Sequence, residues 1–145
     1  MSLVERVQSD TAAALKAGDR ERVHALRLIT AELQKAAKEG GDGGDEVAVL
    51  QRERKRRLEA ASAYRDGGSP ERAQAEEREA EIIQGYMPEQ LSDGELDAIV
   101  GDAIAESGAS SEGEMGKVMA LVMPRVRGRA DGQRVSAVAR EKLSA

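Results

Sequence analysis

The chain of 145 residues contains no cysteine and only one histidine, His24. The lack of cysteine excludes disulfides, thiolate ligands for zinc or iron–sulfur clusters, and a cysteine nucleophile, and it suits a reducing compartment. A single histidine also excludes a metal centre built from several imidazole groups. Neither disulfides nor a metal centre are required for folding, because a chain of this length buries roughly two thirds of its unfolded surface.

Aromatic side chains are almost missing, since Tyr64 and Tyr86 make up the whole 1%. This excludes RNA-binding modules that stack bases on the aromatic residues of a sheet. The core must therefore consist of Ala, Val, Leu, Ile and Met. Charged residues make up 34% of the chain, and the formal net charge of −5 disfavours non-specific binding of polyanions.

Long apolar runs are missing as well. The longest covers residues 118–123, whereas a membrane-spanning helix needs about 20 apolar residues. The first five residues lack the basic start and apolar core of a signal peptide. We therefore expect a soluble, cytoplasmic protein that does not contact a membrane.

What the chain does have is the composition of a helical protein, rich in Ala, Glu, Arg and Lys. Capping boxes are present at Ser2 with Glu5 and at Ser92 with Glu95. Gly18 can end the first helix, and Asp131 can cap the last one. Caps, glycines and prolines divide the chain into seven expected helices, within residues 2–18, 19–39, 45–66, 69–87, 92–108, 115–123 and from 131 onward. Pro88 is expected to end the fourth helix and Pro124 the sixth, and four glycines within residues 40–44 predict a flexible loop.

The pattern of the third expected helix places Val47, Leu50, Leu58 and Ala61 inward. Similar apolar stripes run along the other helices, and the prolines and caps near residues 88–92 mark a joint. We therefore predict an all-α fold of two helical bundles. A four-helix N-terminal domain is expected at residues 1–90, and a three-helix C-terminal domain at residues 91–145.

Residues 52–57 form a strongly basic run, here called the basic cluster. One interpretation is a helix that binds nucleic acid. The other is internal ion pairing, because a hairpin at Gly67 and Gly68 would bring the acidic residues between 76 and 81 alongside.

Charge is separated along the C-terminal part of the chain. Residues 92–116 contain seven acidic residues and no Lys or Arg, whereas residues 117–142 contain seven basic residues against Asp131 and Glu141. We expect a locally uncompensated basic patch, with three of its arginines in the loop that follows Pro124. Its members are Lys117, Arg125, Arg127, Arg129 and Arg134. Guanidinium groups in such a loop suit contacts with successive phosphates, and the competing interpretation is solubilising surface charge.

A search for catalytic motifs yields no candidate. The serines are not flanked by a Gly-x-Ser-x-Gly motif, there is no phosphate-binding P-loop, and the acidic run lacks the histidines of a di-iron bundle. His24 lies off the apolar stripe of its helix, which favours a surface residue over a general base. We therefore predict no catalytic residues, no metal ligands and no cofactor.

Two segments near the C-terminus resemble the signature of the GatB/YqeY family: Glu114-Met115-Gly116-Lys117-Val118-Met119 and Met123-Pro124-Arg125 with Gly128-Arg129-Ala130-Asp131-Gly132. The run Tyr86-Met87-Pro88-Glu89-Gln90-Leu91-Ser92 is similar to that family's interdomain joint. The resemblance extends over essentially the whole chain. It implies two helical bundles and a relation to the tail of the B subunit of the glutamine-dependent tRNA amidotransferase, which engages tRNA.

From this resemblance we expect a non-catalytic accessory protein that binds tRNA or is linked to the amidotransferase. The basic end of the C-terminal domain would contact the RNA backbone. Two alternatives are a helical protein-interaction module, with a partner docked on the N-terminal helices, and a partner-dependent component of glutamine-dependent amide transfer (carbon–nitrogen ligase activity). Gly116, beside Lys117, permits close approach either of a neighbouring helix or of RNA.

Overall fold

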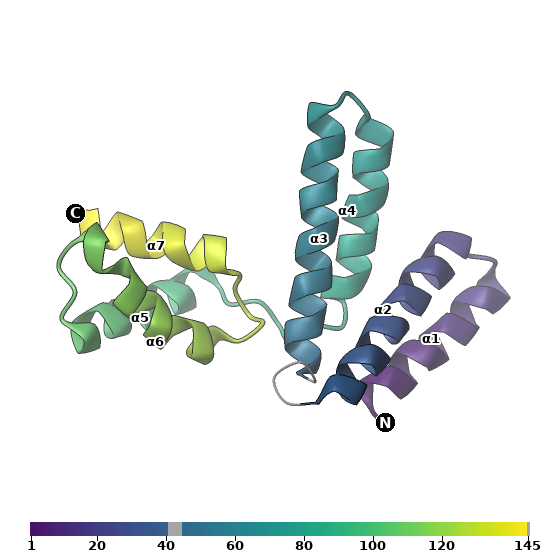
Figure 1. Cartoon of the computed structure of the whole chain (residues 1–145), viewed down its shortest axis with the longest axis horizontal. Coiled ribbons are helices and arrows are strands. Elements are labelled where there is room, and N and C mark those ends of the chain that lie inside the picture. The colour runs from purple at the N-terminus through teal and green to yellow at the C-terminus, as the bar shows by residue number, and fades with distance from the viewer. Residues whose placement is uncertain (41–44, 145) are drawn as a thin grey trace. The chain divides into compact units, whose positions relative to one another are not determined.

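The computed structural model describes residues 1–40 and 45–144, and the regular structure in these ranges is entirely helical (Figure 1). The prediction of an all-α chain is confirmed. The described α-helices are α1 (Leu3–Ala17), α2 (Arg20–Glu39), α3 (Glu46–Asp66), α4 (Pro70–Gln84), α5 (Asp93–Ser107), α6 (Met115–Val126) and α7 (Gly132–Ser144). A short 3₁₀ helix, η2 (Glu112–Glu114), precedes α6. Of the loop predicted at residues 40–44, only Gly40 belongs to the described residues.

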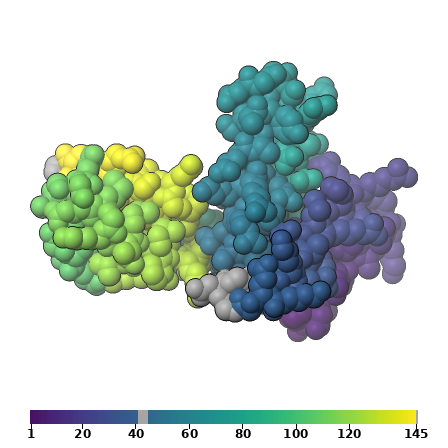
Figure 2. Space-filling view, viewed as in Figure 1, coloured from purple at the N-terminus to yellow at the C-terminus, as the bar shows by residue number. Residues whose placement is uncertain are grey.

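Contacts within the chain divide it into two compact units, Met1–Met87 and Pro88–Ala145. In the first unit α1 pairs with α2, and α3 lies side by side with α4 (Figures 1 and 2). Helix α2 also packs against α3 and α4, so that it links the two pairs. The hydrophobic cluster of this unit is aliphatic apart from Tyr86, and its largest fully buried side chains are Leu26, Ile29, Leu50 and Ile83.

The second unit consists of α5, α6 and α7, each in contact with the other two. Small and β-branched side chains fill its core, where Leu96, Val100, Val118, Val122 and Val135 are fully buried. Valine and alanine let the three short helices approach closely, and this compensates for the lack of aromatic residues.

Several helix ends follow the predicted capping chemistry. The Ser92 hydroxyl accepts from the Glu95 amide, and the Glu95 carboxylate accepts from the Ser92 amide, both at 3.1 Å. At the start of α7, the Asp131 carboxylate accepts from the Arg134 amide at 2.8 Å. Gly18 ends α1 with φ of 74°, a left-handed conformation that strongly favours glycine.

Two expected helix ends are wrong. Helix α4 ends at Gln84, well before Pro88. Helix α6 runs through Pro124 to Val126. A proline in the last turn removes only one backbone donor, so the helix continues until Arg127, whose amide donates to the Met123 carbonyl at 3.2 Å.

The inward face of α3 also differs from the prediction. Leu58, expected in the core, is 38% exposed, whereas Val49 and Glu53 are buried. The buried stripe therefore follows Val49, Glu53, Arg57 and Ala61 at a spacing of four residues. Leu58 lies one residue beyond this stripe, about 100° further around the helix.

None of the helices in the described ranges combines the length and the apolar character that a membrane span requires.

Candidate nucleic-acid interface

Two of the predicted cations, Arg129 and Arg134, lie beside the first turn of α5. The Nη2 of Arg134 is 2.9 Å from the Oδ1 of Asp93, and the Nη2 of Arg129 is 3.8 Å from the Oε2 of Glu95. The Nε of Arg129 also donates to the Glu89 carbonyl at 3.0 Å. Because both carboxylates belong to one helical turn, the structure brings these two guanidinium groups together.

The backbone around Arg129 is held firmly in place. Its carbonyl accepts from the Leu91 amide at 2.8 Å, and its own amide donates to the Val126 carbonyl at 2.7 Å. The side-chain amide of Gln90 donates to the Gly128 carbonyl at 2.8 Å. These bonds connect the segment between α6 and α7 to the segment before α5, so that Arg129 projects from a braced loop.

The predicted cations Lys117 and Arg125 have other partners. The Nζ of Lys117, in the first turn of α6, is 3.3 Å from the Oε2 of Glu114. Hydrogen bonding by the Ser110 amide, with a further contribution from Lys117, lowers the pKa of Glu114. Arg125 belongs to the last turn of α6, not to a loop as expected, and its Nη2 pairs with Glu106 of α5.

Carboxylates of the same unit thus pair with Lys117, Arg125, Arg129 and Arg134, so the expectation of an uncompensated patch is wrong. Glu95 and Glu106, the partners of Arg129 and Arg125, are separated by about 17 Å along α5 at about 1.5 Å per residue. The acidic and basic stretches that are separate in the sequence are neighbours in the folded unit. The fifth cation, Arg127, is the exposed C-cap residue of α6.

Gly116 lies on the exposed side of α6 next to Lys117. A Cβ atom at this position would meet no heavy atom within 4 Å among the described residues. Close packing of a neighbouring helix therefore does not account for the glycine within this unit. The second interpretation, close approach of RNA, stays a prediction.

The basic cluster surrounds a buried carboxylate, that of Glu53, which is only 3% exposed. It accepts hydrogen bonds from the Nη1 of Arg57 at 2.6 Å and of Arg56 at 2.9 Å. The Nε of Arg52 lies 3.9 Å away. The Nε of Arg57 is in addition 3.4 Å from Glu79 of α4. Internal ion pairing is therefore confirmed for these three arginines, but their shared partner is Glu53 rather than the acidic run of α4.

Further charges connect α3 and α4. The Nε of Arg65 donates to the Oε1 of Glu77 at 2.9 Å across the two helices. Partial burial raises the pKa of Glu76, the neighbouring charge of Glu79 raises it further, and Arg57 opposes this shift. Ion pairs thus connect α3 and α4 beyond the basic cluster as well.

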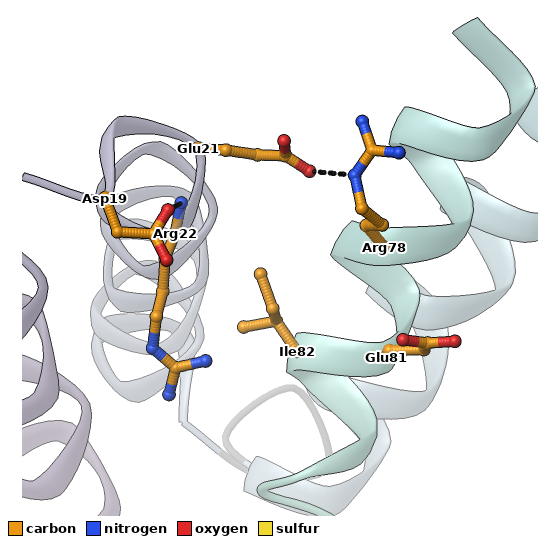
Figure 3. Close-up of a pocket in the computed structure, with 6 residues that line it drawn as sticks. All are labelled: Asp19, Glu21, Arg22, Arg78, Glu81 and Ile82. Atoms are coloured by element: carbon orange, nitrogen blue, oxygen red, sulfur yellow. Dashed lines mark hydrogen bonds and ion pairs between the residues drawn. The ribbon is translucent and has the colours of Figure 1, made fainter. Parts of the chain in front are cut away.

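An open pocket of about 380 Å³ lies between α2 and α4 (Figure 3). Glu21 points from the first turn of α2 toward Arg78 of α4, and their Oε1 and Nε atoms are 2.7 Å apart. The Asp19 carboxylate accepts from the Arg22 amide at 3.1 Å. Acidic and basic side chains both line this pocket, so its charge does not favour a ligand of either sign.

Chemistry-bearing groups are otherwise dispersed. Among residues 1–40 and 45–144, no three His, Asp or Glu side chains are gathered so as to hold a metal ion. His24 is exposed on α2, which agrees with its interpretation as a surface residue. The described features are those of a helical protein with a braced, ion-paired basic loop in its second unit.

The chain belongs to the family of Yqey-like proteins, because the model of that family matches residues 4–143. This confirms the resemblance based on the segments around Lys117 and Arg129. No curated protein matches the chain at a significant level.

Sequence reasoning missed the buried acid Glu53, although a signal was present. Glu53 follows Val49 by four residues and Leu50 by three, so it lies in phase with the apolar stripe. It also precedes Arg56 and Arg57 by three and four residues, the spacing at which side chains meet on a helix. An acidic residue in that phase within a basic run indicates an internal ion pair.

Proposed function

We propose that this Yqey-like protein is a non-catalytic accessory protein that binds tRNA, or that is linked to a tRNA amidotransferase. The basic end of its second unit contacts the RNA backbone in this proposal. The residues assigned to that contact are Lys117, Arg125, Arg127, Arg129 and Arg134. We also propose that residues 1–90 and 91–145 are separate domains, a four-helix and a three-helix bundle.

The observation that carries the proposal is the pairing of Arg129 and Arg134 with carboxylates that face water. Asp93 is fully exposed and the Glu95 side chain is 57% exposed. Exposed ion pairs contribute only about 0.2–1 kcal/mol each. Phosphate oxygens accept charge-assisted hydrogen bonds from arginine as carboxylates do, and they can replace these partners at little cost.

The loop around Arg129 supports the same proposal. Its backbone is fixed by hydrogen bonds to the segment before α5, so little further ordering is needed when RNA binds. With no aromatic side chain described in this unit, base stacking makes no contribution there. The surface is therefore expected to recognise backbone and shape rather than base sequence.

The test compares two double variants of the full chain by fluorescence anisotropy with labelled tRNA. Arg129→Ala with Arg134→Ala is expected to weaken binding about tenfold or more. Arg140→Ala with Lys142→Ala removes the same charge from the distal part of α7 and is expected to change binding less than about threefold. Equal weakening by both pairs would reduce the effect to net charge and contradict the proposed site, and lack of tRNA binding by the unaltered protein would contradict the function.

A further inference from the structure

A groove runs between α1 and α2 on a side to which α3 and α4 contribute no residues. One pocket of about 450 Å³ is lined by both helices, with Leu15, Arg20, Val23, His24 and Arg27 among its lining. A second pocket of about 270 Å³ shares Arg27 and continues along the same two helices to Gln8 and Gln34. We call these two pockets together the α1–α2 groove.

One rim of the α1–α2 groove is basic. Arg20, His24 and Arg27 are spaced by four and three residues, which places them on one face of α2. Their side chains take part in no hydrogen bond or ion pair over residues 1–40 and 45–144. None of the described residues that line the groove is acidic. Lys38 continues the same face toward the end of α2.

Two acidic residues of α2, Glu21 and Glu32, point away from the groove. Glu21 pairs with Arg78 of α4, as Figure 3 shows, and Glu32 lies 3.9 Å from Arg52 of α3. Glu21 and Glu32 are therefore engaged with α4 and α3, whereas Arg20 and Arg27 lie on the groove, unpaired among the described residues. This separation gives the groove a positive charge although the whole chain has a net charge of −5.

The groove also has an apolar component. Leu15, on its α1 side, is 53% exposed, and the neighbouring Ala14 and Val23 are buried beneath it. An exposed leucine beside the phosphates adds little to the affinity for an RNA backbone. An amphipathic helix uses both features, because its apolar residues cover the leucine while its polar edge meets the cations.

We propose that the α1–α2 groove docks an acidic amphipathic helix of a protein partner. Apolar side chains of that helix cover Leu15, and its carboxylates pair with Arg20 and Arg27 and accept a hydrogen bond from His24. Arg20 and Arg27 are about 10 Å apart along α2, so carboxylates about two turns apart on the partner match them. This inference is independent of the RNA contacts proposed for the second unit.

The test is a selection on the immobilised full-length protein from a displayed library of helices of about 16 residues, roughly four turns. Each helix has a fixed ridge of leucine and alanine, and the flanking positions vary among Glu, Gln and Lys. We expect enrichment of Glu on one flank at a spacing of seven residues. Selected peptides with Gln or Lys as often as Glu, or no enrichment at all, would overturn the proposal.

Selected peptides are then measured by anisotropy against variants of the protein. Arg20→Glu with Arg27→Glu is expected to weaken binding about tenfold or more, and Leu15→Ser about threefold. Lys55→Glu with Arg140→Glu makes the same charge change at two residues that do not line the groove and is expected to leave binding within about twofold. Equal loss in this control pair would show that only net charge matters and would overturn the proposal.

A labelled single-stranded RNA serves as a parallel probe. If it binds, and Arg20→Glu with Arg27→Glu abolishes its binding while no acidic helix is enriched, the groove is an RNA surface and the proposal is wrong. Arg129→Ala with Arg134→Ala is expected to leave peptide binding unchanged. Failure of this inference can therefore be distinguished from failure of the tRNA proposal.

Discussion

The hydroxyl group of Tyr86 donates a hydrogen bond to the carboxylate of Asp10, which is 76 residues away in the sequence. This bond joins the segment after α4 to α1. The guanidinium group of Arg6 adds to the contact, since its Cζ atom lies 4.9 Å from the centre of the Tyr86 ring. The end of the first unit is thereby fastened to its first helix just before the second unit begins.

Replacing Tyr86 with phenylalanine is expected to lower the free energy of unfolding by about 1 kcal/mol, because it removes a hydrogen bond to a partly buried carboxylate. Urea denaturation of the full chain measures the change. Tyr64→Phe is the matched control, because no hydrogen bond of the Tyr64 hydroxyl is present among the described residues, and it should change stability by less than about 0.5 kcal/mol. Equal stability of the Tyr86 variant and the unaltered protein would contradict the anchoring role.

The same contact predicts a loss of stability at alkaline pH. Burial, and then the hydrogen bond to Asp10, raises the pKa of Tyr86 to about 12 from 10.0. The unfolded chain therefore loses this proton at lower pH than the folded chain, and the stabilisation is present below pH 10 and lost as the pH rises through about 12. Denaturation between these pH values should show a weaker pH dependence in Tyr86→Phe than in Tyr64→Phe. Identical profiles of the two variants would contradict the assignment.

Glu53 is predicted to be the most sensitive charged residue of the first unit. Glu53→Gln leaves Arg57, whose side chain is only 14% exposed, without its shortest ion pair. Removing one partner of a buried pair costs about 3–5 kcal/mol, and we expect the lower end because Arg57 keeps Glu79. Glu59→Gln, on the same helix but 65% exposed, should cost less than about 0.5 kcal/mol. Similar denaturation midpoints for the two variants would contradict this role.

If the second unit binds RNA, removing the carboxylate that pairs with Arg125 is expected to raise the affinity for tRNA. Glu106→Gln releases Arg125 from its carboxylate partner and is expected to strengthen tRNA binding about two- to threefold. Asp102→Asn removes the same charge from α5, and the structure gives Asp102 no ion pair among the described residues. Titrations of labelled tRNA with both variants separate the effects. An equal gain in both would assign the change to net charge and not to Arg125.

Local chemistry predicted much of the helical architecture. The helix ends lie where the sequence predicted caps, at Ser92 with Glu95, at Asp131 and at Gly18. These signals are reliable because capping depends on a few neighbouring residues only. Pro124 was misleading, because a proline removes its own backbone hydrogen bond to the preceding turn but leaves later amides free to donate, and α6 continues to Val126.

The candidate site was predictable in its residues but not in its electrostatics. The sequence separates the acidic run from the basic run, yet Arg134 meets Asp93 and Arg125 meets Glu106 once α5, α6 and α7 pack together. Such pairing depends on how helices are arranged, which periodicity does not determine. The unpaired cations Arg20 and Arg27 were missed for the same reason, because only the fold shows which acids of α2 are engaged elsewhere.

The central claim, that the second unit contacts the RNA backbone, is tested most directly by the salt dependence of tRNA binding. If about three phosphates are contacted, the logarithm of the binding constant should fall against the logarithm of the salt concentration with a slope of roughly −2 to −3. Arg129→Ala with Arg134→Ala should flatten that slope by about one to two, while circular dichroism shows unchanged helix content. A slope that is the same in the variant and the unaltered protein would place the phosphate contacts elsewhere and contradict the account.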